Sequence, residues 1–218
     1  MKYALLNLPC ESDVARNYGK GLAPPLNHSV YAWLGLRPVR AQHTSAEHEA
    51  LQRWATGRAS LVEIGVAEGV SGLAMREVMA ESGTLSLIDP FHLSRVPALN
   101  FTKRAAHRAV KSYSRGNVRW IEEFSFDAAR VWNAPIDLLL IDGDHSESAV
   151  RTDWDDWNRF VIPGGVVIFH DARVFEGGWT NSDYGPVRLV DDLFRSKKIP
   201  NWTIAEEVHS LVVVERTN

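Results

Sequence analysis

The sequence predicts an α/β protein with a Rossmann-like sheet of seven strands, mostly parallel, with helices on both faces and a C-terminal antiparallel hairpin. Five short apolar runs lie between residues 61 and 169, and helical spacing separates most of them. The runs are continuously apolar, which is typical of parallel strands covered on both faces. Two further runs are joined by a few residues around His209, and so short a connection allows only an antiparallel pair.

The chain divides into a cap and one main domain. Its 218 residues suit one domain with an appendage. Residues 1–45 contain several Pro and Gly residues and little periodicity, so we expect an irregular N-terminal cap that selects the substrate. Residues 46–218 form the main domain. The cap fits either a lid or the interface of a homodimer.

The elements of the main domain follow from local patterns. The helix after the fourth strand has Val150, Trp154, Trp157 and Val161 on one face. Pro186 is placed in the first turn of a C-terminal helix. In order, we expect a helix at 46–56, a strand at 61–64, a helix at 70–78, strands at 85–88, 118–121 and 136–141, a helix at 150–161, a strand at 166–169, a helix at 187–194, and a hairpin of 202–207 and 211–215.

Composition and charge narrow the function. Lys and Arg total 24 and Asp and Glu total 27, a net charge of −3, so we expect no nucleic-acid partner bound through phosphate neutralisation. The single Cys10 excludes an internal disulfide and fits a reducing compartment. The apolar run from Tyr3 to Leu6 is too short for a signal peptide, and no run is long enough to span a membrane. We therefore expect a cytoplasmic protein without a membrane partner.

The first strand ends in a glycine-containing turn. Glu63, Gly65 and Gly69 occur there, where ligands bind in open parallel sheets. The glycines let the backbone approach a ligand, although they also fit a plain tight turn. The dinucleotide fingerprint G-x-G-x-x-G is absent, because Ala67 and Val70 hold its other two glycine positions. The charge of Glu63 suits a ligand that carries an amino group better than a pyrophosphate.

Acidic residues end three further strands. Asp89 is placed to hold the ribose hydroxyls of a nucleoside, or it caps a turn. Asp142 and Asp171 follow adjacent strands, and converging carboxylates can hold a cation such as Mg²⁺. His145 is a candidate general base, because its ordinary pKa is near neutrality, or it is a surface residue. We expect Asp144 to cap the helix that follows.

Together these residues resemble those of a class I S-adenosylmethionine-dependent methyltransferase, over roughly residues 46–215. The pattern Glu63-x-Gly65-x-x-x-Gly69, then Asp89, the Asp142 strand end and the closing hairpin occur in the family's order. The resemblance implies S-adenosylmethionine as cofactor. The implied contacts are Glu63, Gly65, Val66, Ala67, Gly69 and Ser71 at the methionine moiety, Asp89 at the ribose, Phe124 and Ser125 at the adenine, and Asp142 beside them.

Within this superfamily the sequence is most similar to cation-dependent O-methyltransferases of the catechol and caffeoyl-CoA type. The similarity implies a divalent cation, Mg²⁺ or another, held by Asp142, His170 and Asp171, with His145 at the position of the general base. His170 replaces an Asp of the family, which favours a transition metal over Mg²⁺ or removes the site. The implied reaction is O-methylation of a hydroxylated small molecule, with Asp142 and His145 as catalytic residues.

Two functions of other classes stay open. One is a nicotinamide-dependent oxidoreductase, which the missing glycines and Glu63 disfavour. The other is a non-catalytic module that binds S-adenosylmethionine or a metabolite. The presence of Asp142, His145 and Asp171 argues against this second alternative.

Overall fold

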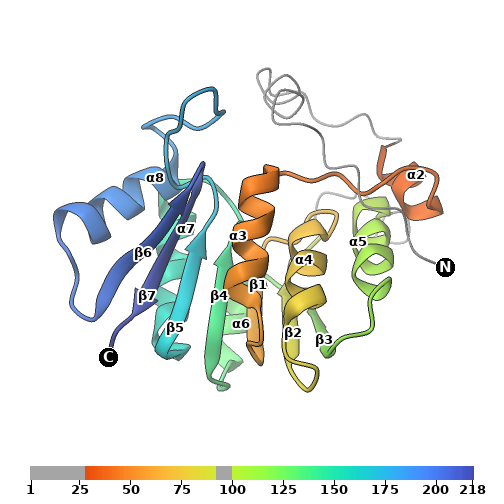
Figure 1. The fold of residues 1–218 in the computed structure, drawn as a ribbon, viewed down its shortest axis with the longest axis horizontal. Helices are drawn as coiled ribbons and strands as arrows, with labels where there is room; N and C mark the ends of the chain where they lie inside the picture. Colours follow the sequence, from red (N-terminus) through yellow and green to blue (C-terminus); the bar gives the residue numbers. More distant parts are fainter. Residues whose placement is uncertain (1–27, 92–99) are drawn as a thin grey trace.

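A computed structural model of the protein describes residues 28–91 and 100–218 (Figure 1). Its strands are β1 (Ser60–Ile64), β2 (Thr84–Ile88), β3 (Asn117–Ile121), β4 (Ile136–Ile141), β5 (Val161–Phe169), β6 (Trp202–Val208) and β7 (Leu211–Arg216). They form one seven-stranded sheet in the order β3-β2-β1-β4-β5-β7-β6. Strands β1 to β5 pair in parallel, while β7 pairs antiparallel with both β5 and β6. The predicted fold class is confirmed.

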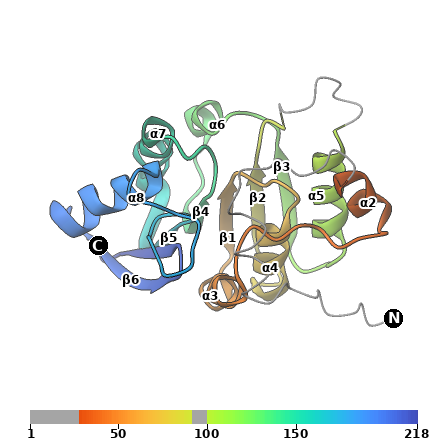
Figure 2. The same cartoon turned by 90° about the horizontal axis from the view of Figure 1, so that it is seen from above.

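Helices cover both faces of the sheet. They are α2 (His28–Leu34), α3 (Ser45–Ala55), α4 (Val70–Val78), α5 (Phe101–Lys111), α6 (Ser125–Val131), α7 (Glu147–Trp157) and α8 (Gly185–Val190), with the 3-10 helix η2 (Asn158–Phe160) and the π-helix η3 (Asp191–Ser196). Figure 2 shows α3, α4 and α5 on one face and α6, α7 and α8 on the other. Two buried clusters follow, one around Trp157 and Phe169 and one around Leu51 and Met75. The inner strands β1, β2, β4 and β7 are therefore mostly buried, as apolar strands covered on both faces require, whereas the edge strands β3 and β6 contain no buried residue.

Two details differ from the sequence prediction. The helix after β4 ends at Trp157, and Val161 instead begins β5. The reason is a register shift: Ile136 pairs with Val161 and Leu138 pairs with Val166, so β5 contains an irregular stretch that the helical pattern concealed. The N-terminal segment is not irregular throughout, because it contains α2. Residues 1–27 of the expected cap lie outside the described residues.

The start of α7 also differs. Ser146, not Asp144, is the N-cap, and its Oγ accepts a hydrogen bond of 3.3 Å from the Ala149 backbone N–H. Asp144 accepts a 2.7 Å bond from the Ser146 backbone N–H and so shapes the turn before the helix. Within the two described ranges, no helix is both long enough and apolar enough to cross a membrane.

Candidate active site

The carboxyl ends of four neighbouring strands form one edge of the sheet. The last residues of β1, β2, β4 and β5 pair with one another in register. The residues that follow them, Gly65, Asp89, Asp142 and His170, therefore lie along a common edge. A cleft of about 830 Å³ opens over this edge, which is a volume typical of small-molecule sites.

Most of the predicted cofactor contacts line this cleft. Those on its wall are Gly65, Val66, Ala67, Asp89, Phe124, Ser125 and Asp142, together with the predicted base His145. Glu63, Gly69 and Ser71 are not among the lining residues. The structure thus brings together the residues predicted to lie at the ribose and the adenine, and only part of the set predicted at the methionine moiety.

Gly65 is required where β1 meets the edge of β4. Its φ is +86°, and a Cβ there would lie 2.1 Å from the backbone oxygen of Asp142. Both the left-handed conformation and the close approach exclude a side chain at this position. The turn after β1 therefore packs directly against the backbone that carries Asp142.

Asp89 holds the same turn from the other side. Its Oδ2 accepts hydrogen bonds from the backbone N–H groups of Val66, at 2.9 Å, and Ala67, at 3.3 Å. Its Oδ1 accepts a 2.7 Å bond from the N–H of Phe91. Asp89 therefore fixes the shape of the cleft wall while lining the cleft itself.

Glu63 lies beneath the turn. It is fully buried and its Oε1 accepts a hydrogen bond from Ser71 Oγ, while its Oε2 has no hydrogen-bond partner within residues 28–91 and 100–218. Burial raises the pKa of Glu63 well above its usual range, although the Ser71 bond opposes the shift. Here Glu63 joins β1 to α4 rather than facing the cleft.

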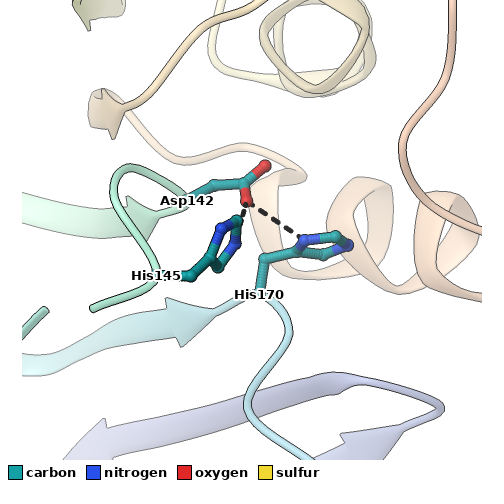
Figure 3. Close-up of side chains that lie close together, drawn as sticks. All are labelled: Asp142, His145 and His170. Carbon is teal, nitrogen blue, oxygen red and sulfur yellow. Dashed lines mark ion pairs between the residues drawn. The ribbon is translucent and has the colours of Figure 1, made fainter. Parts of the chain in front are cut away.

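A group of three side chains lies beside the cleft (Figure 3). Atoms of Asp142, His145 and His170 that could ligate a metal ion lie within 4.8 Å of one another. The Nδ1 atom of His170 is 3.1 Å from Asp142 Oδ1, and the Nε2 atom of His145 is 3.8 Å from the same oxygen. The side chains of Asp142 and His170 are 17% and 5% exposed, whereas that of His145 is 42% exposed. His145 is thus the member most accessible from the cleft.

Asp171, the third residue of the predicted metal set, lies beside this group, with its Oδ1 3.4 Å from His170 Nδ1. Its Oδ1 accepts a 2.6 Å hydrogen bond from Trp179 Nε1. Its Oδ2 lies 3.3 Å from His145 Nε2. Asp171 thus contacts two members of the group, and the metal set of Asp142, His170 and Asp171 stays a prediction.

The charges of these groups are strongly coupled. Burial disfavours the charged form of Asp142, but the imidazoles of His170 and His145 hold the pKa of its carboxyl well below the usual range. Burial likewise opposes protonation of His170, yet Asp142, Asp171 and Glu47 raise its pKa to about 10. The neighbouring Asp142 raises the pKa of His145 against the effect of burial. The group therefore stabilises positive charge on its imidazoles.

Glu47 supports His170 from behind and was not predicted. This buried carboxylate on α3 lies 3.9 Å from His170 Nε2 through its Oε2. Its Oε2 also accepts a 2.7 Å bond from the Thr44 N–H, and its Oε1 accepts bonds from the backbone N–H and Oγ of Ser210. Its sequence signal is the capping box with Thr44, which explains helix formation but gives no indication of His170.

Two further features of the cleft were missed. Glu68 accepts hydrogen bonds from Ser29 Oγ at 2.6 Å and from the Arg40 backbone N–H at 2.7 Å, which fastens the segment around α2 over the cleft. Asp153 on α7 lines the cleft and accepts a hydrogen bond from Ser125 Oγ. Burial raises the pKa of Asp153 to about 6. Neither carboxylate lies at a strand end, which was the signal used to find the other site residues.

Comparison with known proteins gives the family. The sequence pattern of a methyltransferase domain matches residues 62–172, which is more than half of the chain. The protein belongs to this methyltransferase family. The match begins within β1 and ends just beyond Asp171, so it contains the turn, Asp89 and the Asp142 group. It confirms the predicted enzyme class.

Individual relatives are distant. An uncharacterized protein of Acanthamoeba polyphaga mimivirus is 29% identical over 146 residues, and the match covers 64% of this chain and 62% of that protein. The chain therefore spans less than two thirds of this curated relative.

Solved structures of low identity share the fold. The O-methyltransferase TomG from Streptomyces achromogenes, in complex with S-adenosylmethionine, has a TM-score of 0.61 and 16% identity over 94% of this chain and 96% of its own. An rRNA methylase from Streptococcus thermophilus has a TM-score of 0.51 and 10% identity over 79% of this chain and 95% of its own. The predicted class I S-adenosylmethionine-dependent methyltransferase fold is confirmed. Because one neighbour is named an rRNA methylase, the expected exclusion of nucleic acid has no support from the fold.

Proposed function

We propose that this methyltransferase transfers the methyl group of S-adenosylmethionine to a hydroxyl group of a small molecule. The observation that carries the proposal is the placement of His145, a basic side chain on the wall of the cleft with carboxylates 3.3 and 3.8 Å away. In this proposal the cofactor occupies the 830 Å³ cleft, with its ribose at Asp89 and its adenine at Phe124 and Ser125.

The reaction requires alignment and removal of one proton. The sulfonium is already a reactive methyl donor, so the enzyme has to hold the acceptor oxygen in line with the methyl group. The Nε2 atom of His145 faces the two carboxylates, so the other ring nitrogen, Nδ1, accepts the hydroxyl proton as the new C–O bond forms and the C–S bond breaks. The carboxylates of Asp171 and Asp142 then stabilise the imidazolium, as a carboxylate does for the histidine of a catalytic triad.

The residues also fit a divalent cation. Among the described residues neither buried ring nitrogen of His170 makes a hydrogen bond, and a cation would take the place of the proton in its 3.1 Å ion pair with Asp142. Asp142 and His170 would hold the ion, and the imidazole favours a transition metal over Mg²⁺. A bound cation supplies positive charge that lowers the pKa of a nearby hydroxyl.

Binding of the cofactor is the first test. We expect isothermal titration calorimetry to show micromolar binding of S-adenosylmethionine and S-adenosylhomocysteine, and no binding of a nicotinamide dinucleotide. Asp89→Ala is expected to weaken cofactor binding, because it removes a residue of the wall and three hydrogen bonds of the turn. If neither S-adenosylmethionine nor S-adenosylhomocysteine binds, whether Mn²⁺ is present or absent, the proposal is wrong.

Methyl transfer is the second test. A panel of hydroxylated acceptors is incubated with methyl-labelled S-adenosylmethionine, and His145→Ala is expected to abolish labelling while the cofactor still binds. Asp155→Asn, an exposed acidic position on α7, is the control and is expected to match the wild type. If His145→Ala lowers the affinity for Mn²⁺ instead, His145 is a metal ligand and its role as base is wrong. This panel tests the predicted small-molecule acceptor. A mass measurement in solution tests the predicted homodimer.

A further inference from the structure

A second cavity, of about 500 Å³, lies over α5 and outside the cofactor cleft. We call it the α5 basic groove and define it by the residues Trp33, Lys103, Arg104, His107, Arg108 and Lys111. All five basic residues belong to α5. The groove contrasts with the whole chain, whose net charge is −3.

The helix itself does not explain this arrangement. Lys103, His107 and Lys111 follow one another at intervals of four residues, and so do Arg104 and Arg108. Residues at this spacing are neighbours on a helix surface, where like charges destabilise the helix. The inward face of α5 consists of Ala and Val side chains and is buried separately. The basic face therefore has a cost for folding that a ligand would offset.

Several of the basic side chains are held in place by the protein. The Arg104 guanidinium lies 5.0 Å from the centre of the Trp33 ring. Arg108 packs against Gly35, where a Cβ would be 2.3 Å from its Nη2 atom. Lys103 pairs with Glu122 at 2.6 Å. Neither Arg108 nor Lys111 has an ion pair with any residue of 28–91 or 100–218, so uncompensated charge remains in the groove.

The surroundings of His107 also contain an excess of positive charge. Its ring stacks on Trp120 with 3.7 Å between centres, and its Nε2 is buried without a hydrogen-bond partner in the described structure. Burial lowers the pKa of His107, and the charges of Lys111 and Lys103 lower it further. A neutral imidazole nitrogen is thus left in a cavity whose other polar groups are mainly cations.

We propose that the α5 basic groove binds the diphosphate group of a small molecule. Arg108 and Lys111 supply two positive charges that have no ion pair among residues 28–91 and 100–218, and a diphosphate offers one phosphate group to each of them. Arg108 and Lys111 are three residues apart on α5 and are therefore neighbours on its surface, so two adjacent phosphate groups of one molecule can contact both. Guanidinium groups are suited to phosphate because they donate two parallel hydrogen bonds.

The groove adjoins the cofactor cleft. Asn100 lines both cavities, and its side chain donates a 2.6 Å hydrogen bond to the Phe91 backbone oxygen in the cleft wall. A diphosphate-bearing molecule in the groove would therefore lie beside the cofactor. This inference goes beyond the proposed methyl transfer and does not depend on the nature of the acceptor.

The test is titration calorimetry of the whole chain with inorganic pyrophosphate at low ionic strength. We expect binding that the double variant Arg108→Glu/Lys111→Glu weakens at least about tenfold, since it reverses two charges of the groove. The control Arg159→Glu/Lys198→Glu makes the same charge change at two exposed positions elsewhere and is expected to leave binding unchanged. Both double variants should bind S-adenosylmethionine like the wild type, which shows that they are folded and separates this test from that of the methyltransferase reaction.

Several outcomes would contradict the proposed diphosphate site. Absence of pyrophosphate binding, or equal weakening by the control variant, overturns the proposal. Orthophosphate that binds as tightly as pyrophosphate refutes the diphosphate assignment. A single-stranded oligoribonucleotide that binds more tightly than pyrophosphate, and loses affinity in the groove variant, assigns the groove to nucleic acid instead. If the Glu variants fail to fold, Arg108→Ala/Lys111→Ala replaces them with the same expected direction.

Discussion

Replacement of Asp153 by Asn is expected to stabilise the protein, in a way that depends on pH. Asp153 is 5% exposed on α7, and burial raises the pKa of its carboxyl from 3.8 to about 6. The folded protein therefore favours the neutral carboxyl, which an Asn side chain imitates. The Asn oxygen can still accept the hydrogen bond that Ser125 Oγ donates.

The expected magnitude follows from the shift. A rise of about two units, at about 1.4 kcal/mol per unit, corresponds to roughly 3 kcal/mol of stability that the neutral carboxyl contributes and the ionised one does not. Because the folded pKa lies above the unfolded value, this contribution is complete below pH 3.8 and is lost as the pH rises through about 6. Above that pH, Asp153→Asn should therefore exceed the wild type by up to this amount.

Thermal unfolding without cofactor, between pH 4 and pH 8, measures the effect. At about 2 to 4 °C per kcal/mol for a domain of this size, the variant should unfold roughly 6 to 12 °C above the wild type at pH 8 and close to it at pH 4. Asp155→Asn, an exposed position on the same helix, should give no such divergence. Equal unfolding temperatures at pH 8, or a difference independent of pH, would refute the reasoning.

Three further variants test the site. Gly65→Ala places a Cβ 2.1 Å from the Asp142 backbone oxygen and requires a φ of +86°, so we expect a loss of more than about 2 kcal/mol of stability in denaturant titrations, and no binding of S-adenosylmethionine in calorimetry. Glu47→Gln removes the carboxylate behind His170, and we expect absorption spectroscopy to show about a tenfold loss of Co²⁺ affinity. The control Glu49→Gln, at an exposed position on the same helix, should leave the Co²⁺ affinity unchanged. Glu68→Gln weakens the attachment of the segment around α2, so stopped-flow measurements should show faster cofactor release, and an unchanged rate would contradict this role.

The inner parallel strands β1, β2 and β4 could be predicted because they are short and mostly apolar. Each run that ends in Gly, Asp or His coincides with a strand whose last residues are buried, as a parallel sheet with two covered faces requires. The start of β5 could not be predicted, because Val161 continues the helical spacing of Trp154 and Trp157. Only the pairing with Ile136 on β4 decides that Val161 is extended, and this pairing depends on residues distant in sequence.

The candidate site was predictable where it depends on strand ends. Asp89, Asp142 and His145 were found because parallel strands bring their carboxyl ends to one edge. Glu47 and Asp153 could not be found in this way, since both lie within helices and reach the site only through packing. The place of Glu63 was also unpredictable: the same strand end could direct its side chain to the cleft or beneath it, and the buried bond from Ser71 decides.

The bonds between Glu47 and Ser210 join positions 163 residues apart and have a consequence for the order of folding. Contacts of long sequence separation form late, because closing a large loop costs entropy before any contact compensates for it. During synthesis, α3 leaves the ribosome well before Ser210 does, and its buried carboxylate obtains these hydrogen bonds only after the turn between β6 and β7 has been made. A nascent chain that ends before Ser210 would therefore expose an incompletely paired Glu47, and the surroundings of His170 would be among the last parts of the molecule to acquire their native form.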